Sequence, residues 1–283
     1  MSETKITVLC ENTSGRMMGV TGEHGFSALI EKQGQKLLFD TGQGMSLENN
    51  AKYLQKNLSR IEQVVLSHGH YDHTGGLPAV LYPPRKVKVT AHPGIFENKL
   101  AEHQLVSGQS LFYIGMPYSY EFLTKGLYAD FDLQTEFCEI GPGIYYSGQV
   151  PRETDFEHPD PHLKVEDNTQ IQVDQVWDDI SLLIDTEKGP VVLLGCAHAG
   201  MVNVLNHFCK NTGYKKFHAV IGGTHLGFQG PGEQLEKSLQ ALQDYQVDLV
   251  AVSHCTGQEI GAICYNRFPE RFSFANAGWT QTF

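Results

Sequence analysis

The feature that most constrains this 283-residue chain is a cluster of three histidines and one aspartate at positions 68–73, in the run Ser67-His-Gly-His-Tyr-Asp-His-Thr-Gly-Gly76. The cluster follows Ile61–Leu66, a short run with β-branched residues that is typical of a strand buried on both faces. A loop at the end of such a strand can direct several side chains to one point, and imidazole and carboxylate groups there suit zinc, iron or manganese. The sequence therefore predicts a metal site at the end of a buried strand.

Both ends of the chain repeat an order of strand, polar loop and helix. We expect strands at 6–10, 26–31, 36–39, 61–66, 87–91, 180–184, 191–194, 218–221 and 249–253. We expect helices near 46–57, 74–81, 202–208 and 233–245. This order suits sheets sandwiched between helices, so the predicted fold class is α/β (α+β) in a single domain spanning 1–283.

The middle of the chain, residues 95–165, differs because it is rich in aromatic side chains and carries several glycines and prolines. Two interpretations are open. The segment is either an additional packing layer with irregular loops, or an insert that caps the site with aromatic surface and sets substrate choice.

Composition limits the kinds of partner. The formal net charge is −11 and the basic residues are scattered, so we expect no nucleic-acid partner. A small-molecule substrate is compatible, even an anionic one, because bound metal ions reverse the local field. No segment resembles a signal peptide or a membrane span, so we expect a cytoplasmic protein without a membrane partner, whose six cysteines are thiols. The sequence does not predict the oligomeric state.

The pattern His68-x-His70-x-Asp72-His73 resembles the signature of the metallo-β-lactamase superfamily, and Asp40 in Leu37-Leu-Phe-Asp-Thr-Gly42 matches its preceding Asp-x-Gly element. The resemblance implies a four-layer αββα sandwich with metals at the sheet edge. It also implies that His68 and His70 hold one metal ion, while Asp72 and His73 serve the second. Asp40 would then accept a hydrogen bond from a ligand imidazole and fix its tautomer.

Two later elements of the family are expected downstream. The strand at 191–194 runs into Gly-Cys-Ala-His198, where most relatives have Gly-Asp, and the resemblance implies that His198 is a ligand. Cys196 is either a bridging thiolate or a buried thiol. The strand at 249–253 delivers His254, which is also implied as a ligand.

The family's separate third-element histidine, expected before residue 190, has no clear counterpart in the sequence. Asp178 or Asp179 is a candidate to replace it as an oxygen ligand. His158 and His162 lie in a proline-rich stretch and are expected at the surface.

Two other histidines have open roles. His225, in Gly222-Gly-Thr-His-Leu226, either contacts substrate and donates a proton or is structural. His24 follows a glycine-rich loop and is placed near the site entrance without a role. Together with Glu11-Asn-Thr13 and His254-Cys-Thr-Gly257, these motifs resemble a subgroup named for the archaeal dihydropterin-forming ribofuranosylaminobenzene 5′-phosphate synthase.

The first functional hypothesis is hydrolysis of a small phosphoester, lactone or thioester. Two divalent ions, zinc before iron or manganese, would lower the pKa of a shared water and yield hydroxide, which Asp72 would help to orient. The alternative is a transfer reaction in pterin biosynthesis, as the subgroup implies, in which the metals stabilise an oxyanion or a leaving group.

Two further alternatives are disfavoured by the motif itself. Di-iron oxidoreductases of the superfamily carry Glu where this chain has His70, and usually a fused flavin domain. A metal-free binding protein would have no need for an intact His68, His70, Asp72 and His73.

Overall fold

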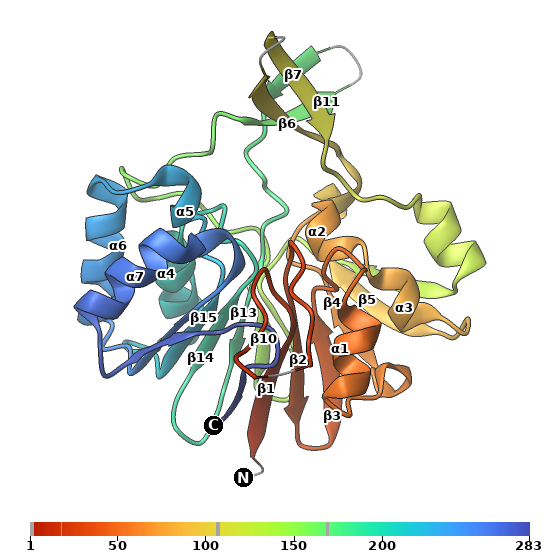
Figure 1. Ribbon diagram of the computed structural model, residues 1–283, viewed down its shortest axis with the longest axis horizontal. Helices are drawn as coiled ribbons and strands as arrows, with labels where there is room; N and C mark the ends of the chain where they lie inside the picture. The colour runs from red at the N-terminus through yellow and green to blue at the C-terminus, as the bar shows by residue number, and fades with distance from the viewer. Residues whose placement is uncertain (1–2, 18, 106–107, 168–169) are drawn as a thin grey trace.

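The computed structural model describes residues 3–17, 19–105, 108–167 and 170–283. In these ranges two seven-stranded sheets pack face to face, with helices on the outer face of each (Figure 1). The first sheet, in spatial order, consists of β18 (Thr280–Thr282), β1 (Thr4–Cys10), β2 (Ser27–Lys32), β3 (Gln35–Phe39), β4 (Gln63–Val65), β5 (Val87–Ala91) and β8 (Ala129–Leu133). The second consists of β17 (Phe272–Phe274), β16 (Leu249–Val252), β15 (Ala219–Gly222), β14 (Val191–Leu194), β13 (Ser181–Ile184), β10 (Ile144–Tyr146) and β9 (Cys138–Gly141).

Helices form the two outer layers. On the first sheet lie α1 (Leu47–Tyr53) and α3 (Leu77–Leu81). On the second lie α4 (Met201–Thr212), α6 (Glu233–Asp244) and α7 (Gly257–Arg267). The short helices α2 (Tyr71–Thr74) and α5 (Leu226–Gln229) lie where loops leave the sheets. The four-layer αββα prediction is confirmed.

Strand β14 shows how the layers are held together. Val191 and Leu193 belong to the apolar cluster between the two sheets, whereas Val192 and Leu194 belong to the cluster beneath α4 and α6. All four side chains are fully buried, as expected for a strand covered on both faces. The continuous apolar run that predicted this strand thus reflects burial from two sides.

The expected strands lie within two residues of their predicted bounds, but the helix expected at 46–57 ends early. α1 stops at Tyr53, and Gln55 has a left-handed φ of 56° that breaks the helix. A 3₁₀ turn, η1 (Leu58–Arg60), follows. Leu54 and Leu58 still pack on the core under α1, so their helical spacing reflected burial and not a continuous helix.

Parallel pairing sets the position of the site. In the first sheet β3, β4, β5 and β8 are parallel, and in the second β14, β15, β16 and β17 are parallel. The carboxyl ends of parallel strands meet at one edge of a sheet. The loops after β4, β14, β15 and β16, which carry the predicted site residues, therefore leave the sheets at such edges.

A third, four-stranded sheet, here called the cap sheet, stands above the two main sheets (Figure 1). Its spatial order is β12 (Gln170–Val173), β11 (Leu163–Asp167), β6 (Asn98–Leu105) and β7 (Gly108–Tyr113). The intervening β8, β9 and β10 belong to the main sheets, so the cap sheet does not coincide with the segment 95–165. The division into one domain with an insert stays a prediction. Among the described residues, no helix has both the length and the apolarity that a membrane crossing requires.

Candidate metal centre

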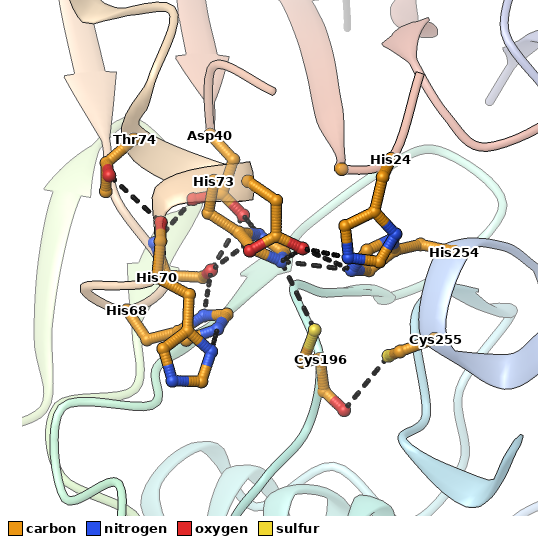
Figure 2. A network of polar contacts seen from close by, with 12 residues as sticks. His24, Asp40, His68, His70, His73, Thr74, Cys196, His254 and Cys255 are labelled. Carbon is orange, nitrogen blue, oxygen red and sulfur yellow. Dashed lines mark hydrogen bonds and ion pairs between the residues drawn. The ribbon is translucent and has the colours of Figure 1, made fainter. Parts of the chain in front are cut away.

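Loops from both main sheets converge between the sheets and the cap. The loop after β4 carries His68 and His70, and the loop after β14 carries Cys196 and His198. His254 lies two residues after the end of β16. Figure 2 shows the side chains of His68, His70, Cys196 and His254 gathered at one place from different parts of the chain. All of them are buried.

His68, His70 and His198 form the first cluster of candidate metal ligands. The Nε2 atom of His68 lies 2.9 Å from Nδ1 of His70 and 3.3 Å from Nε2 of His198. Burial lowers the pKa of all three imidazoles, to about 3 for His70, so they are neutral and offer lone pairs. The buried Nε2 of His70 has no hydrogen-bond partner among the residues that the structure describes. Converging neutral imidazoles with an unpartnered nitrogen fit a divalent metal ion.

The loop between these histidines is held tightly. Gly69 packs against the backbone carbonyl of Ile95, and a Cβ atom at position 69 would overlap that oxygen. The Gly69 N–H donates to Oδ2 of Asp178 at 2.7 Å. The glycine of the His-Gly-His run is therefore required by close backbone approach.

Asp40 orients His73, as the resemblance implied. Its buried Oδ2 accepts from His73 Nδ1 at 2.7 Å and from the Ser67 hydroxyl at 2.7 Å. The Nε2 atom of His73 consequently lies 3.2 Å from Sγ of Cys196 and 3.2 Å from Nε2 of His254. Burial lowers the pKa of His73, but neighbouring carboxylates, Asp40 first, raise it to about 9. Binding of a cation at Nε2 would displace that proton.

Asp72 lies in another cluster of candidate ligands, with His24 and His254. Its Oδ2 is 3.0 Å from Nε2 of His24 and 3.3 Å from Nε2 of His254. The hydrogen bond to Asp72 raises the pKa of His24. Burial alone would raise the pKa of Asp72, but the surrounding histidines lower it well below its usual value, so the side chain is a carboxylate.

Two residues near the amino terminus hold His254. The Glu11 carboxylate accepts from the His254 backbone N–H at 2.6 Å, and Asn12 Oδ1 accepts from His254 Nδ1 at 2.8 Å. The latter bond leaves Nε2 as the lone-pair nitrogen, directed at Asp72 and His73. His254 has a left-handed φ of 50°, which these contacts stabilise.

Cysteines enter the centre at two positions. Cys196 and Cys255, together with His254, form a group of potential ligands. Burial raises the pKa of Cys196 well above its usual value. Burial acts on Cys255 in the same direction, but hydrogen bonds from Cys196 and His225 lower the pKa of Cys255 well below its usual value.

His225 lies beside the first cluster, with its ring centroid 4.3 Å from that of His198. Its Nε2 is 3.1 Å from Oδ2 of Asp160, and its backbone is left-handed with φ of 56°. Burial lowers the pKa of His225, but the hydrogen bond to Asp160 is among the contacts that raise it to about 9. The side chain carries a proton at neutral pH, and its role as a proton donor stays a prediction.

Neither Asp178 nor Asp179 belongs to the candidate ligand groups among the described residues. Asp178 instead binds Lys99, with Nζ to Oδ1 at 2.7 Å. Asp179 accepts from the Ala199 N–H at 3.0 Å, and burial raises its pKa to about 7. The side chain beside His68 and His70 is that of His198, which the resemblance implied as a ligand, and a ligand role for Asp178 or Asp179 stays a prediction.

The centre opens into a cavity of about 590 Å³ between the main sheets and the cap sheet. Its floor includes His70, Asp72, His198 and Cys196. Its walls combine apolar and polar groups, namely Tyr71, Ala101, Glu102, His103, Gln104, Ile114, Asp160, His162, Leu163, His225 and Phe228. A cavity of this size accommodates a small organic molecule. His162 thus faces the cavity while being exposed, as predicted.

The sequence profile described as "Metallo-beta-lactamase superfamily" matches residues 20–254. This chain belongs to the metallo-β-lactamase superfamily. Within the superfamily it is 31% identical, over 97% of its length and 95% of the relative's, to the Methanocaldococcus jannaschii 7,8-dihydropterin-6-methyl-4-(β-D-ribofuranosyl)-aminobenzene-5′-phosphate synthase. The crystal structure of Tm1679, described as a metal-dependent hydrolase of the β-lactamase superfamily, superimposes with a TM-score of 0.83 at 28% identity and covers 98% of both chains.

A weaker similarity bears on the expected partners of this superfamily member. The ribonuclease Z of Treponema pallidum is 24% identical over 48% of this chain and 38% of its own length. Such a partial match transfers no activity. The absence of a nucleic-acid partner therefore stays a prediction from net charge.

Several residues of this metallo-β-lactamase centre had no assigned role in the sequence. Glu11 and Asn12 were noted only as part of a motif, and Asp160 and Lys99 were not noted. Asn12 lies 242 residues from His254 in the sequence, so no local pattern relates them. His24 was placed near the entrance, and its contact with Asp72 gives it a position in the centre.

Proposed function

We propose that this superfamily member is a metal-dependent hydrolase that holds two divalent ions and cleaves a small phosphoester, lactone or thioester. The observation that supports the proposal is that two adjacent groups of candidate ligands lie beside one cavity, which His70, Asp72, His198 and His254 line. His68, His70 and His198 form the first group. The second consists of Asp72, His73 and His254, because Nε2 of His73 and Nε2 of His254 lie 3.9 and 3.3 Å from Oδ2 of Asp72.

The chemistry divides between the ions and the chain. When bound, divalent ions supply Lewis acidity and lower the pKa of a water molecule toward neutrality. The Asp72 carboxylate, held by His24 at 3.0 Å, lies beside His254 in the second group and would accept a hydrogen bond from that water. His225 holds a proton at the cavity wall through its bond to Asp160 and can donate it to a leaving group.

The cavity supports a small, partly polar substrate. Phe228 and Ile114 provide apolar surface, whereas His103 and His162 provide hydrogen-bond donors. Zinc is the expected metal, with iron or manganese as alternatives, because imidazole and carboxylate ligands accept all three.

The test is hydrolysis by protein loaded with each metal separately, measured on a phosphodiester, a lactone and a thioester. We expect one class to be cleaved, and His68→Ala and Asp72→Asn to lower kcat/KM by at least about 100-fold. His225→Gln should lower kcat more than it raises KM. A matched control is His207→Gln on α4, outside the cavity lining, which should leave kcat/KM unchanged. No hydrolysis of any class by protein with two bound ions would refute the proposal.

A second candidate is group transfer, which the 31% identity to the synthase over nearly the whole of both chains favours. In that case the same residues would bind a pterin diphosphate and a ribosyl-aminobenzene acceptor. Incubation with both compounds separates the alternatives, because a transferase gives coupled product whereas a hydrolase gives only phosphate-containing cleavage products.

A further inference from the structure

We infer that Cys196 and Cys255 together with His254 form a thiolate position for one of the divalent ions. The inference rests on the proposed function in assuming that ions bind at this centre. It assigns a role to Cys255, which the sequence showed only as part of His254-Cys-Thr-Gly257, and it predicts which class of metal the centre takes.

The distances allow a shared ion. Sγ of Cys196, Sγ of Cys255 and a ring nitrogen of His254 all lie within 4.8 Å of one another. Zn–S and Zn–N bonds of about 2.3 and 2.0 Å in a tetrahedral site place ligand atoms roughly 3.5 Å apart. Cys196 Sγ is already 3.2 Å from His73 Nε2, which in turn is 3.2 Å from His254 Nε2. Figure 2 shows Cys196 directed at these imidazoles.

The backbone makes room for the second sulfur. Cys196 follows β14, Cys255 follows β16, and Gly223 follows the strand between them. A Cβ atom at position 223 would lie 2.6 Å from Sγ of Cys255. Glycine at this position therefore lets the Cys255 sulfur lie against the neighbouring strand end, next to Cys196.

Contacts to Cys255 are compatible with a thiolate. The His225 backbone N–H donates to Cys255 Sγ at 3.3 Å, and hydrogen bonds to a charged group favour the charged form. As a thiol, Cys255 donates to the Cys196 carbonyl at 3.7 Å, a long contact that a bond from this sulfur to a metal ion would replace. Both sulfurs are nearly inaccessible in the fold except where they line the cavity.

The two thiolates would compensate part of the positive charge of the divalent ions. An imidazole that binds a metal ion through a ring nitrogen is neutral, so His68, His70 and His198 would compensate none of the charge of two dications. Within the ligand groups of the described residues, Asp72 is the carboxylate, and Cys196 stands where an aspartate was expected. Two thiolates would supply the missing negative charge. They would also select zinc, iron(II) or cobalt(II) over magnesium, calcium or manganese, which prefer oxygen ligands.

The test is titration of metal-free, fully reduced protein with cobalt(II). Thiolate ligands give an intense sulfur-to-cobalt charge-transfer absorption in the near ultraviolet, which imidazole and carboxylate ligands do not. We expect this band in the wild-type protein, about half its intensity in Cys196→Ser and in Cys255→Ser, and none in the double variant. Cys209→Ser, at a half-buried thiol on α4, is the matched control and should retain the full band.

Three outcomes distinguish failure of the proposed thiolate position from failure of the proposed hydrolase activity. A full band in Cys255→Ser would overturn the assignment of Cys255, and no band in the wild-type protein with cobalt bound would overturn the thiolate position altogether. Cobalt bound with the expected band but without hydrolysis of any substrate would support the thiolate position while refuting the proposed hydrolase. Circular dichroism of each variant verifies that the fold is retained.

Discussion

At the scale of single residues, Asn12 shows how one amide can organise a metal centre. Its Oδ1 accepts from Nδ1 of His254 at 2.8 Å and from the Gly25 N–H at 3.2 Å. These bonds join the first and last thirds of the chain and leave the His254 Nε2 atom facing Asp72. The ligand tautomer of His254 is therefore set by a residue outside the ligand groups.

We predict that Asn12→Ala weakens metal binding by about 10- to 100-fold, because His254 loses the acceptor that fixes its tautomer. Asn12→Asp retains an oxygen acceptor at this position and should recover most of the affinity. A competition titration against a chelating dye measures both variants. Asn211→Ala, on the exposed surface of α4, serves as the control. Unchanged affinity in Asn12→Ala would remove Asn12 from the centre.

Residues of the centre were predictable from the sequence where they are close to one another both in the sequence and in the structure. His68, His70, Asp72 and His73 form one short motif, and a buried strand delivers it. Asn12 and Asp160 were not predictable, because each acts on a histidine far away in the sequence. The partner of such a residue is decided by the packing of the two sheets.

At the scale of elements, a buried ion pair ties the cap sheet to the metal-binding loop. Lys99 on β6 is fully buried and contacts Asp178 at 2.7 Å and Asp174 at 2.9 Å. The other oxygen of Asp178 accepts from the Gly69 N–H, between two candidate ligands. The position of β6 is thereby coupled to the loop after β4.

We predict that Lys99→Met lowers the free energy of unfolding by about 3–5 kcal/mol, because it leaves two buried carboxylates without a cation. Urea denaturation of the metal-free protein measures the loss. Lys125→Met is the matched control, since Lys125 pairs with Glu121 on an exposed surface and should change stability by less than about 1 kcal/mol. A loss below about 1 kcal/mol for Lys99→Met would show that the carboxylates find other partners or protonate.

Nine of the fourteen main-sheet strands were predicted, because burial on both faces leaves continuous apolar runs such as Val191–Leu194, whereas β8, β9, β10, β17 and β18 were not predicted. The cap sheet was not predicted as a sheet. Strand β12, with the sequence Gln-Ile-Gln-Val, is exposed along its whole length, so no apolar face marks it. α7 was also missed, since Gly257 and Gly261 interrupt its sequence. A Cβ atom at position 261 would overlap the ring of Phe274, so glycine lets this exposed ring pack on the helix.

At the scale of the whole molecule, the metal centre joins the two sheets. His68, His70, Asp72 and His73 come from the first half of the chain, whereas Cys196, His198 and His254 come from the second. The groups from the two halves meet only when the sheets are packed. Bound ions therefore stabilise the packed state and not the separate sheets.

We predict that removing the ions with a chelator lowers Tm by roughly 5–10 °C. Each ion stabilises the folded state by about 2.7 kcal/mol when its free concentration is a hundred times its Kd, and this stabilisation is lost with the ion. Differential scanning calorimetry of loaded and stripped protein measures the change. In the double variant His68→Ala with His254→Ala, the chelator should leave Tm unaltered. A wild-type Tm that does not respond to chelation would mean that the packed sheets preform the centre without help from the ions.

The separateness of the cap sheet has a consequence for how this enzyme family can diversify. Strands β6, β7, β11 and β12 pair only with one another within the described residues, so changes in their sequence, other than at the buried Lys99, leave the registers of the main sheets intact. Ala101, His103 and Leu163 of this region line the cavity, whereas the candidate ligands lie on the loops of the main sheets. Descendants of one ancestor can thus inherit the same metal chemistry while their cap sheets evolve toward different substrates.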